Sequence, residues 1–420
     1  MTPAAAMATG ATASAPPARM PAYAGFAALL AMAGLPIYIH APKFYVDAYG
    51  VSLTALGAAL FALRLLDFVQ DPALGWLASA SRRHRGAAAG LATGAMALAM
   101  LGLFAVTPPV APLAWFALTL TVLFSAFSFL TICFYAQGVV TAEAMGRDGH
   151  LRLAAWRETG ALLGVCLAAV APTVLALGLE SPFAAFAAGF AAVALAAGMA
   201  MRAEWRVGAA LPGVPLGRIL ADRTARRLLL LAFLNAAPVA VTSTLFLFFV
   251  ESRLQLPGLE GPLLLVFFLS AAVAAPFWAR LARRTGARPA LMAGMALSIL
   301  AFGFALTLGS GDLWPFVAIC AASGAALGAD MTLLSAIFAR RMARVAPEAG
   351  MAFGLWAFAT KATLALAAAT VLPALEAAGF RPGAEADADA LRALSLLYAG
   401  VPCVLKFFAL ALLARTPVEE

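Results

Sequence analysis

Long apolar segments separated by short polar segments follow one another along almost the whole chain. A membrane-spanning helix needs about 20 mainly apolar residues, because the hydrocarbon core is about 30 Å thick and an α-helix rises about 1.5 Å per residue. The apolar segments lack the alternation at every second residue that marks the strands of membrane barrels. The pattern therefore predicts an all-α integral membrane protein with twelve transmembrane helices. They are expected at residues 21–45, 53–78, 87–107, 112–140, 153–177, 183–203, 227–250, 260–281, 289–309, 314–339, 350–376 and 390–415.

The predicted helices fall into two sets of six. Between the sets lies the longest internal polar segment, residues 204–226. A tight basic turn follows the second helix, at residues 81–86, and another follows the eighth helix, at residues 280–286, which indicates two halves of similar design. We therefore expect a disordered cytoplasmic tail at 1–20, an N-terminal six-helix half at 21–203, a cytoplasmic linker at 204–226 and a C-terminal six-helix half at 227–415.

Arginine residues gather in alternate loops between the predicted helices. One set of loops carries clusters, for example at residues 82–85, 280–288 and 340–344, whereas the opposite loops hold few basic residues. Short cytoplasmic loops of membrane proteins are enriched in Lys and Arg. This asymmetry predicts a multi-pass protein of the inner (plasma) membrane with both termini in the cytoplasm.

Composition supports the membrane class and excludes others. Of 420 residues, 64% are hydrophobic and 11% are charged, with a mean hydropathy of +0.94, whereas soluble domains carry about 25% charged residues. The net charge of +8 comes from loop arginines and not from a basic face interleaved with aromatic residues, so no nucleic-acid partner is expected. All four cysteines lie in apolar segments, which favours buried thiols over disulfides.

The second predicted helix carries three charged residues, Arg64, Asp67 and Asp71. A charge at the centre of a span costs roughly 2.5 to 3.5 kcal/mol on insertion scales and is usually functional. The spacing places all three on one helical face, with the aspartates about 6 Å apart along the axis. Pro72 has no N–H, so the carbonyl of Phe68 loses its usual partner. This carbonyl and the two carboxylates suit Na⁺ or H⁺; a structural ion pair between Arg64 and Asp67 is the alternative.

These segments resemble one known family. Residues 67–76, DFVQDPALGW, preceded by Arg64, are similar to the helix-two signature of the glycoside-pentoside-hexuronide cation symporters, the melibiose-permease type of the major facilitator superfamily. Further matches lie at residues 44–52, Tyr135, Arg152, 156–157 and Lys361.

The resemblance implies the major facilitator fold, with two six-helix halves around a site in the middle of the membrane. It assigns the binding of a coupling cation to Asp67 and Asp71, and the shaping of the central cavity to Arg157 and Lys361. Lys361 is expected to face the same cavity as the second helix.

The sequence also departs from that family. Acidic residues that grip sugar hydroxyls in melibiose-type members are missing, since no acid lies between residues 20 and 46 and position 131 is Thr131. Ser79 stands where the family usually has an aspartate, which weakens an expected cytoplasmic latch. The role of Asp330 is open.

Other polar residues in the predicted spans have alternative interpretations. Glu158 fits either a second titratable site or a local partner of Arg157. Lys406 is expected to extend its charged end towards the cytoplasm along its apolar stem. Asn235 and Thr242 fit either solute binding or hydrogen bonding between helices. We expect the substrate cavity to be lined by Arg64, Thr131, Tyr135, Arg157, Asn235 and Lys361.

These features predict a secondary active transporter that moves a small solute, sugar-like or an organic anion, coupled to Na⁺ or H⁺ by alternating access. The alternatives are a transporter of lysolipids or other amphiphiles and an integral-membrane enzyme acting on lipid. The enzyme is disfavoured because the sequence contains no HExxH or GxSxG pattern. We expect no cofactor besides the coupling ion, no metal beyond Na⁺, and a monomer whose partners are its solute and membrane lipid.

Overall fold

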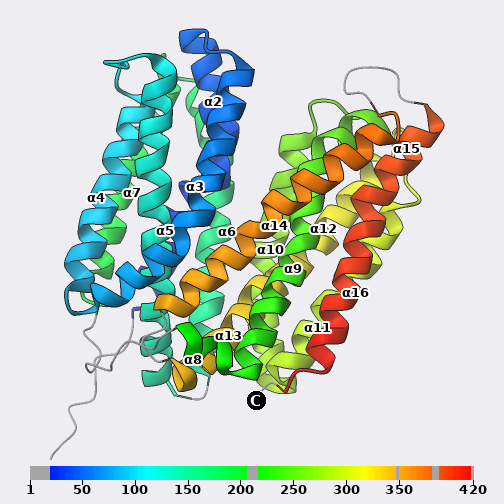
Figure 1. Cartoon of the computed structure of the whole chain (residues 1–420). Coiled ribbons are helices and arrows are strands. Elements are labelled where there is room, and N and C mark those ends of the chain that lie inside the picture. The colour runs from blue at the N-terminus through cyan, green and yellow to red at the C-terminus, as the bar shows by residue number, and fades with distance from the viewer. Residues whose placement is uncertain (1–18, 147, 206–215, 347–349, 381–386, 418–420) are drawn as a thin grey trace, which may run out of the picture.

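The computed structural model shows an all-helical protein, as predicted. It describes residues 19–146, 148–205, 216–346, 350–380 and 387–417. No strand occurs within these ranges. The helices gather in two bundles that lie side by side, one from each half of the sequence (Figure 1). The predicted tail lies almost entirely outside the described residues, since the first 18 residues are not among them.

The N-terminal bundle contains the first six membrane spans. The first span is broken at Ala33 and Gly34, where the expectation was a single helix over 21–45. Pro36 stands in the first turn of the second segment, where the missing N–H of proline is tolerated. The helices are α1 (Met20–Met32), α2 (Leu35–Tyr49), α3 (Leu53–Ala80), α4 (Arg85–Phe104), α5 (Pro112–Ala144), α6 (Gly149–Leu175) and α7 (Pro182–Met201).

The C-terminal bundle contains the other six spans. Residues 206–215 of the segment predicted as the linker lie outside the described residues, and a short helix, α8 (Leu216–Ala221), follows them. Three spans contain π-helical turns, at Phe249–Arg253, Asp330–Leu334 and Leu396–Gly400. The helices are α9 (Arg223–Phe248), α10 (Glu260–Thr285), α11 (Ala287–Ala305), α12 (Leu313–Ala329), α13 (Ser335–Val345), α14 (Gly350–Ala377), α15 (Ala388–Ser395) and α16 (Val401–Ala414).

The number of spans agrees with the sequence. Among the described residues, ten helical segments are long and apolar enough to cross a membrane. Two further spans complete the predicted twelve. One is the broken span of α1 and α2, and the other is α3, which carries Arg64, Asp67 and Asp71 along its length.

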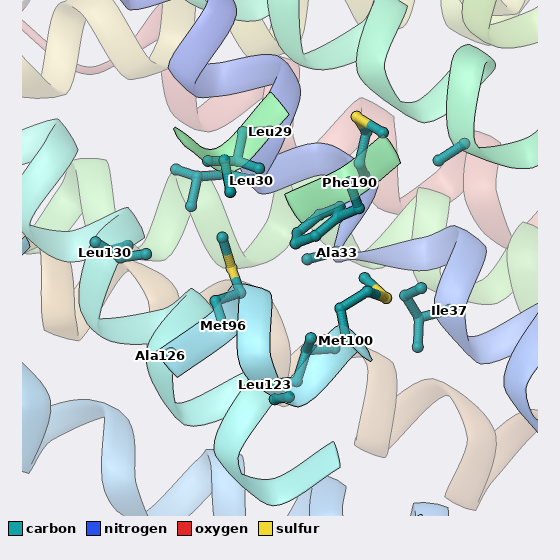
Figure 2. Packing of buried hydrophobic residues seen from close by; sticks show 14 of the residues in the cluster. Leu29, Leu30, Ala33, Ile37, Met96, Met100, Leu123, Ala126, Leu130 and Phe190 are labelled. Atoms are coloured by element: carbon teal, nitrogen blue, oxygen red, sulfur yellow. The ribbon is translucent and has the colours of Figure 1, made fainter. Parts of the chain in front are cut away.

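Each bundle has its own apolar core, and a third core joins them. The core of the N-terminal bundle packs α1 and α2 against α4, α5 and α7, where Leu29, Ile37, Met100 and Phe190 meet (Figure 2). A second core lies within the C-terminal bundle around Phe249. The third contains buried residues of α3 and α5 together with residues of α9 to α14 and α16. Buried apolar side chains therefore hold the two bundles together over part of their length.

This shared core lies towards one end of the molecule, which we call the terminal face. It is the end with α8, α13 and the C-terminus, whereas α2 and α15 lie at the opposite end (Figure 1). Contacts between the bundles run from α3 to α14 and from α6 to α10, and α13 packs against α5 and α6. The main contacts of α2 and α15 stay within their own bundles. The two bundles are thus closed on each other at the terminal face.

Glycines bring α3 and α14 into backbone contact near the terminal face. A Cβ atom added to Gly354 would lie 3.0 Å from the Cα of Gly75 and 3.1 Å from the carbonyl oxygen of Asp71. Such small residues let membrane helices approach closely. Lys361 lies two helical turns after Gly354, so this crossing directs it towards α3.

Candidate functional site

Asp67 and Asp71 are buried on α3 within the membrane. Asp67 is 5% exposed and Asp71 is fully buried. Gln70 donates a hydrogen bond from Nε2 to Oδ1 of Asp67 at 2.8 Å, and Ser125 of α5 donates to Oε1 of Gln70 at 3.0 Å. An uncompensated buried carboxylate is costly. The chain from Ser125 through Gln70 therefore offsets part of the cost of holding Asp67 in this position.

Lys361 brings a positive charge to both aspartates from the other bundle. Its Nζ lies 3.0 Å from Oδ2 of Asp71 and 3.8 Å from Oδ2 of Asp67. It also lies 2.7 Å from Oγ of Ser128 on α5 and donates to it. We call Asp67, Gln70, Asp71, Ser128 and Lys361 the interbundle cluster. When both carboxylates are ionised, one ammonium faces two negative charges, so the cluster can accept one further cation.

The predicted site also includes Arg64 and Phe68. Arg64 and Phe68 lie in α3, but their side chains are outside the described part of the molecule. The proposed ion pair of Arg64 with Asp67 and the role of the Phe68 carbonyl as a cation ligand both stay predictions. Pro72 does lie inside α3, and the helix continues past it to Ala80.

Arg157 of α6 forms a second contact between the bundles. Its Nε donates to Oε1 of Glu158 at 2.9 Å, and its terminal nitrogen donates to Oγ of Ser335 on α13 at 2.9 Å. The guanidinium stacks on the ring of Tyr135, with its carbon 3.7 Å from the ring centre. The hydroxyl of Tyr135 donates to Oε1 of Glu158 at 3.0 Å. Glu158 is thus the local partner of Arg157, one of the two roles the sequence left open.

The structure corrects the expectation for Lys406. This side chain does not extend to the membrane surface; it is 2% exposed and lies inside the C-terminal bundle. Its Nζ donates to Oδ2 of Asp330 and, at 2.6 Å, to Oδ1 of Asn235. The reason is electrostatic. The ammonium group of Lys406 pairs with the buried carboxylate of Asp330, which lies closer to it than the water at the membrane surface. We call Asn235, Asp330 and Lys406 the C-bundle triad.

A cavity of about 270 Å³ connects the triad with the Arg157 contact. Asn235 and Asp330 lie in its wall on one side, and Tyr135 and Glu158 of the N-terminal bundle lie on the other. Thr131 is not among the lining residues, and its hydroxyl donates to the carbonyl of Phe127 in its own helix. The other lining residues are Ala232, Ala236, Val239, Ala240, Leu327, Met331, Leu334, Ser335, Trp356, Thr360, Thr363 and Leu364.

Sequence reasoning did not find several residues of the site. Gln70 follows Asp67 by three positions and so shares its helical face, which is a signal the spacing contained. Ser128, Ser335 and Trp356 gave none, because a lone serine or tryptophan in an apolar span resembles many others. The part of the chain that the structure describes holds no group of three or more His, Cys, Asp or Glu residues suited to a metal ion. The carboxylates of the interbundle cluster remain the candidates for Na⁺ or H⁺.

Comparison with solved structures places this arrangement in a known fold. A bacterial homologue of the iron transporter ferroportin, in an outward-facing state, superposes with a TM-score of 0.70 at 13% identity and covers 93% of this chain and 99% of that chain. The Escherichia coli fucose:proton symporter superposes with a TM-score of 0.62 at 14% identity, covering 93% of this chain and 98% of its own. At such identities the likeness shows the fold alone. No curated protein sequence matches.

Sequence comparison with protein families identifies the relationship more closely. The family model described as "MFS/sugar transport protein" matches residues 20–420, which is nearly the whole chain. The match includes α3 with its two aspartates and α14 with Lys361, the segments on which the resemblance to cation symporters rested. The chain is a multi-pass membrane transporter and not an enzyme, and it belongs to the MFS/sugar transport protein family of the major facilitator superfamily.

Proposed function

We propose that this transporter is secondary active and couples the movement of a small polar solute, sugar-like or an organic anion, to Na⁺ or H⁺. The observation that carries the proposal is the interbundle cluster, in which Lys361 of one bundle binds Asp71 and approaches Asp67 of the other. An ion pair between two moving halves forms or breaks according to their relative position. They therefore offer a means of linking ion binding to the conformational cycle.

The charge balance of the cluster explains how coupling would work. Two carboxylates this close cannot both remain ionised cheaply unless a cation accompanies them. Lys361 supplies one positive charge while the bundles are in contact. When the bundles separate at this point, Na⁺ or H⁺ takes the place of the ammonium. Ion affinity then depends on conformation, and by linkage the solute and the ion affect each other's binding equally.

The proposal includes a membrane orientation. We place the termini in the cytoplasm of the cell and the protein in the inner membrane, on the arginine asymmetry of the loops. The terminal face, where the shared apolar core closes the bundles, is then the cytoplasmic face. In this conformation the cavity between the bundles would open outwards, and alternating access would reverse the closure.

Uptake into proteoliposomes tests the coupling. Radiolabelled neutral sugars, sugar acids and a lysolipid are offered with an inward Na⁺ gradient, with a pH gradient, and with neither. We expect wild-type protein to accumulate a polar solute only with a gradient. The Asp67→Asn, Asp71→Asn double variant should still insert and exchange solute but lose accumulation, whereas Asp389→Asn, at an exposed position, should behave as wild type. Accumulation by the double variant with unchanged ion dependence would refute the assignment.

A further inference from the structure

The C-bundle triad is a buried polar group outside the interbundle cluster. Asn235 comes from α9, Asp330 from the π-helical turn after α12, and Lys406 from α16. All three side chains are at least nine-tenths buried, with exposures of 6%, 7% and 2%. Burying an ion pair among membrane helices is expensive and usually marks a functional site. Asn235 and Asp330 also lie in the wall of a cavity, a position that a purely structural role does not require.

The hydrogen bonds of Lys406 determine what the other two residues can still bind. An ammonium has donors only, so the amide of Asn235 must present its oxygen to Lys406. Its Nδ2 has two N–H donors, of which the side-chain interaction with Asp330 uses one at most, so at least one serves another partner. Asp330 accepts from Lys406 with Oδ2, and its buried Oδ1 makes no hydrogen bond. A buried acceptor without a partner is unfavourable and calls for one. The triad therefore offers one N–H donor and one unpartnered acceptor side by side.

We propose that Asn235 and Asp330 together bind one hydroxyl group of the transported solute, and that Lys406 is the positioning residue that orients both. A hydroxyl group donates one hydrogen bond and accepts others, so it can donate to Oδ1 of Asp330 while it accepts from Nδ2 of Asn235. The π-helical turn at Asp330–Leu334 supports this role, because such turns often place side chains at functional sites. This inference rests on the proposed function, since it names contacts for the same solute.

The charges around the cavity favour a neutral solute over an organic anion. Among the described side chains, Arg157 is bonded to Glu158, Lys361 to Asp71 and Lys406 to Asp330. Each of these three cations already faces a carboxylate of the protein. The cavity volume of about 270 Å³ lies just below the range for ligand pockets, about 300 to 1,000 Å³. Both features suit a small molecule that carries hydroxyl groups.

The test measures binding, so that it is independent of the ion gradient. Purified protein is titrated calorimetrically with glucose, galactose, fucose and xylose, with the monodeoxy analogues of each sugar that binds, and with glucuronate as the anionic counterpart. For wild type we expect a neutral sugar to bind better than glucuronate. We also expect removal of one particular hydroxyl to weaken binding roughly ten- to a hundredfold, because the buried groups of the triad would lose their partner.

Two variants separate recognition from packing. Asn235→Ala removes the amide and leaves the ion pair, whereas the Asp330→Leu, Lys406→Met double variant removes the pair and its acceptor oxygens without leaving an unbalanced charge. Both should bind the parent sugar and its deoxy analogue with nearly equal affinity, a loss of discrimination that a structural defect alone would not produce. The matched control is Ser323→Ala on α12, whose hydroxyl bonds to its own helix and lies outside the cavity. It should keep wild-type discrimination.

The outcomes separate this inference from the proposed function. Full discrimination in both variants would overturn the hydroxyl-binding role of the triad even if gradient-driven uptake is observed. Preference of wild type for glucuronate, or binding of no neutral sugar in the series, would overturn the inference as well. Loss of discrimination in the variants without any gradient-driven uptake would support the triad and refute the coupling proposal alone.

Discussion

Two buried lysines in this transporter have opposite relationships to the moving parts of the fold. Lys361 belongs to α14 and bonds to Asp71 of α3, which lies in the other bundle. Lys406 belongs to α16 and bonds to Asn235 and Asp330, which lie in its own bundle. Movement of one bundle against the other would separate the first set of charges and leave the second intact. The first is therefore suited to switching and the second to maintaining a fixed binding surface.

The two lysines also differ in their burial and in the charges that they face. The side chain of Lys361 is 20% exposed and faces two carboxylates, so a cation from water can reach the site and has a charge to neutralise. The side chain of Lys406 is 2% exposed and faces one carboxylate. A balanced and inaccessible pair has no reason to exchange its cation. The role of an intramembrane lysine therefore depends on the number and the location of its partners, not on its depth alone.

The largest expected effect comes from removing Lys406. Lys406→Met leaves Asp330 buried without its counter-charge, and breaking a buried pair in this way costs about 3 to 5 kcal/mol. We expect a large fall in melting temperature in detergent. Lys361→Met should cost less, because the side chain of Lys361 is more exposed than that of Lys406 and its two carboxylates can bind Na⁺ or H⁺ instead. The melting temperature of this variant should therefore rise more steeply with Na⁺ or with acid than that of wild type.

Restoring the charge balance provides the control for this comparison. The Asp330→Asn, Lys406→Met double variant should recover most of the lost stability. Equal destabilisation by Lys406→Met and Lys361→Met, with the same ion dependence, would show that the two sites do not differ in the way described here.

A smaller effect is expected where α3 crosses α14. Gly354→Ala would place a Cβ 3.0 Å from the Cα of Gly75, so the two helices must move apart, and overpacking of this kind costs roughly 1 to 3 kcal/mol. The separation should lengthen the contact of Lys361 with Asp71 and reduce coupled uptake. Gly57→Ala on α3 is the matched control, because nothing lies within 4 Å of a Cβ at that position. Equal uptake and melting temperature in the two variants would contradict the close crossing.

The smallest effect is expected at an ion pair near the membrane surface. Arg341 of α13 donates to both carboxylate oxygens of Asp222, at 3.2 and 2.5 Å, and these hydrogen bonds hold the pKa of Asp222 below its usual value. A lowered pKa in the folded state means that the stabilisation is present above the unfolded pKa, about 4, and is lost as the pH falls through the folded value.

Asp222→Asn isolates this ion pair, since asparagine can still cap α9 through the N–H of Ala225. At neutral pH the variant should lose up to about 1 kcal/mol, as is typical of pairs near the surface. The difference in melting temperature from wild type should begin to shrink as the pH falls through about 4 and approach zero below the lowered pKa of Asp222. A difference that stays constant as the pH falls would show that the pair does not titrate as described.

The sequence by itself determined the class, the spans and the first half of the site. The length of the apolar segments gave twelve helices because the thickness of a membrane sets a minimum length for each one. The first span was the exception, since the break at Gly34 depends on local backbone geometry inside an otherwise continuous apolar segment. The spacing of Asp67 and Asp71 placed them on one face because the helical period is fixed. For two residues of one helix, that period alone is enough to decide whether they share a face.

Only the tertiary structure decided which charges meet. Lys406 was expected at the membrane surface, but it lies against Asp330 and Asn235, which are 76 and 171 positions away along the chain. Ser128 and Ser335 likewise acquire their roles from helices distant in sequence. Helical periodicity says which face of a helix is polar, but the crossing of two helices, such as α3 and α14 at their glycines, decides what that face touches. In a membrane the cost of an unpaired charge then fixes the partner.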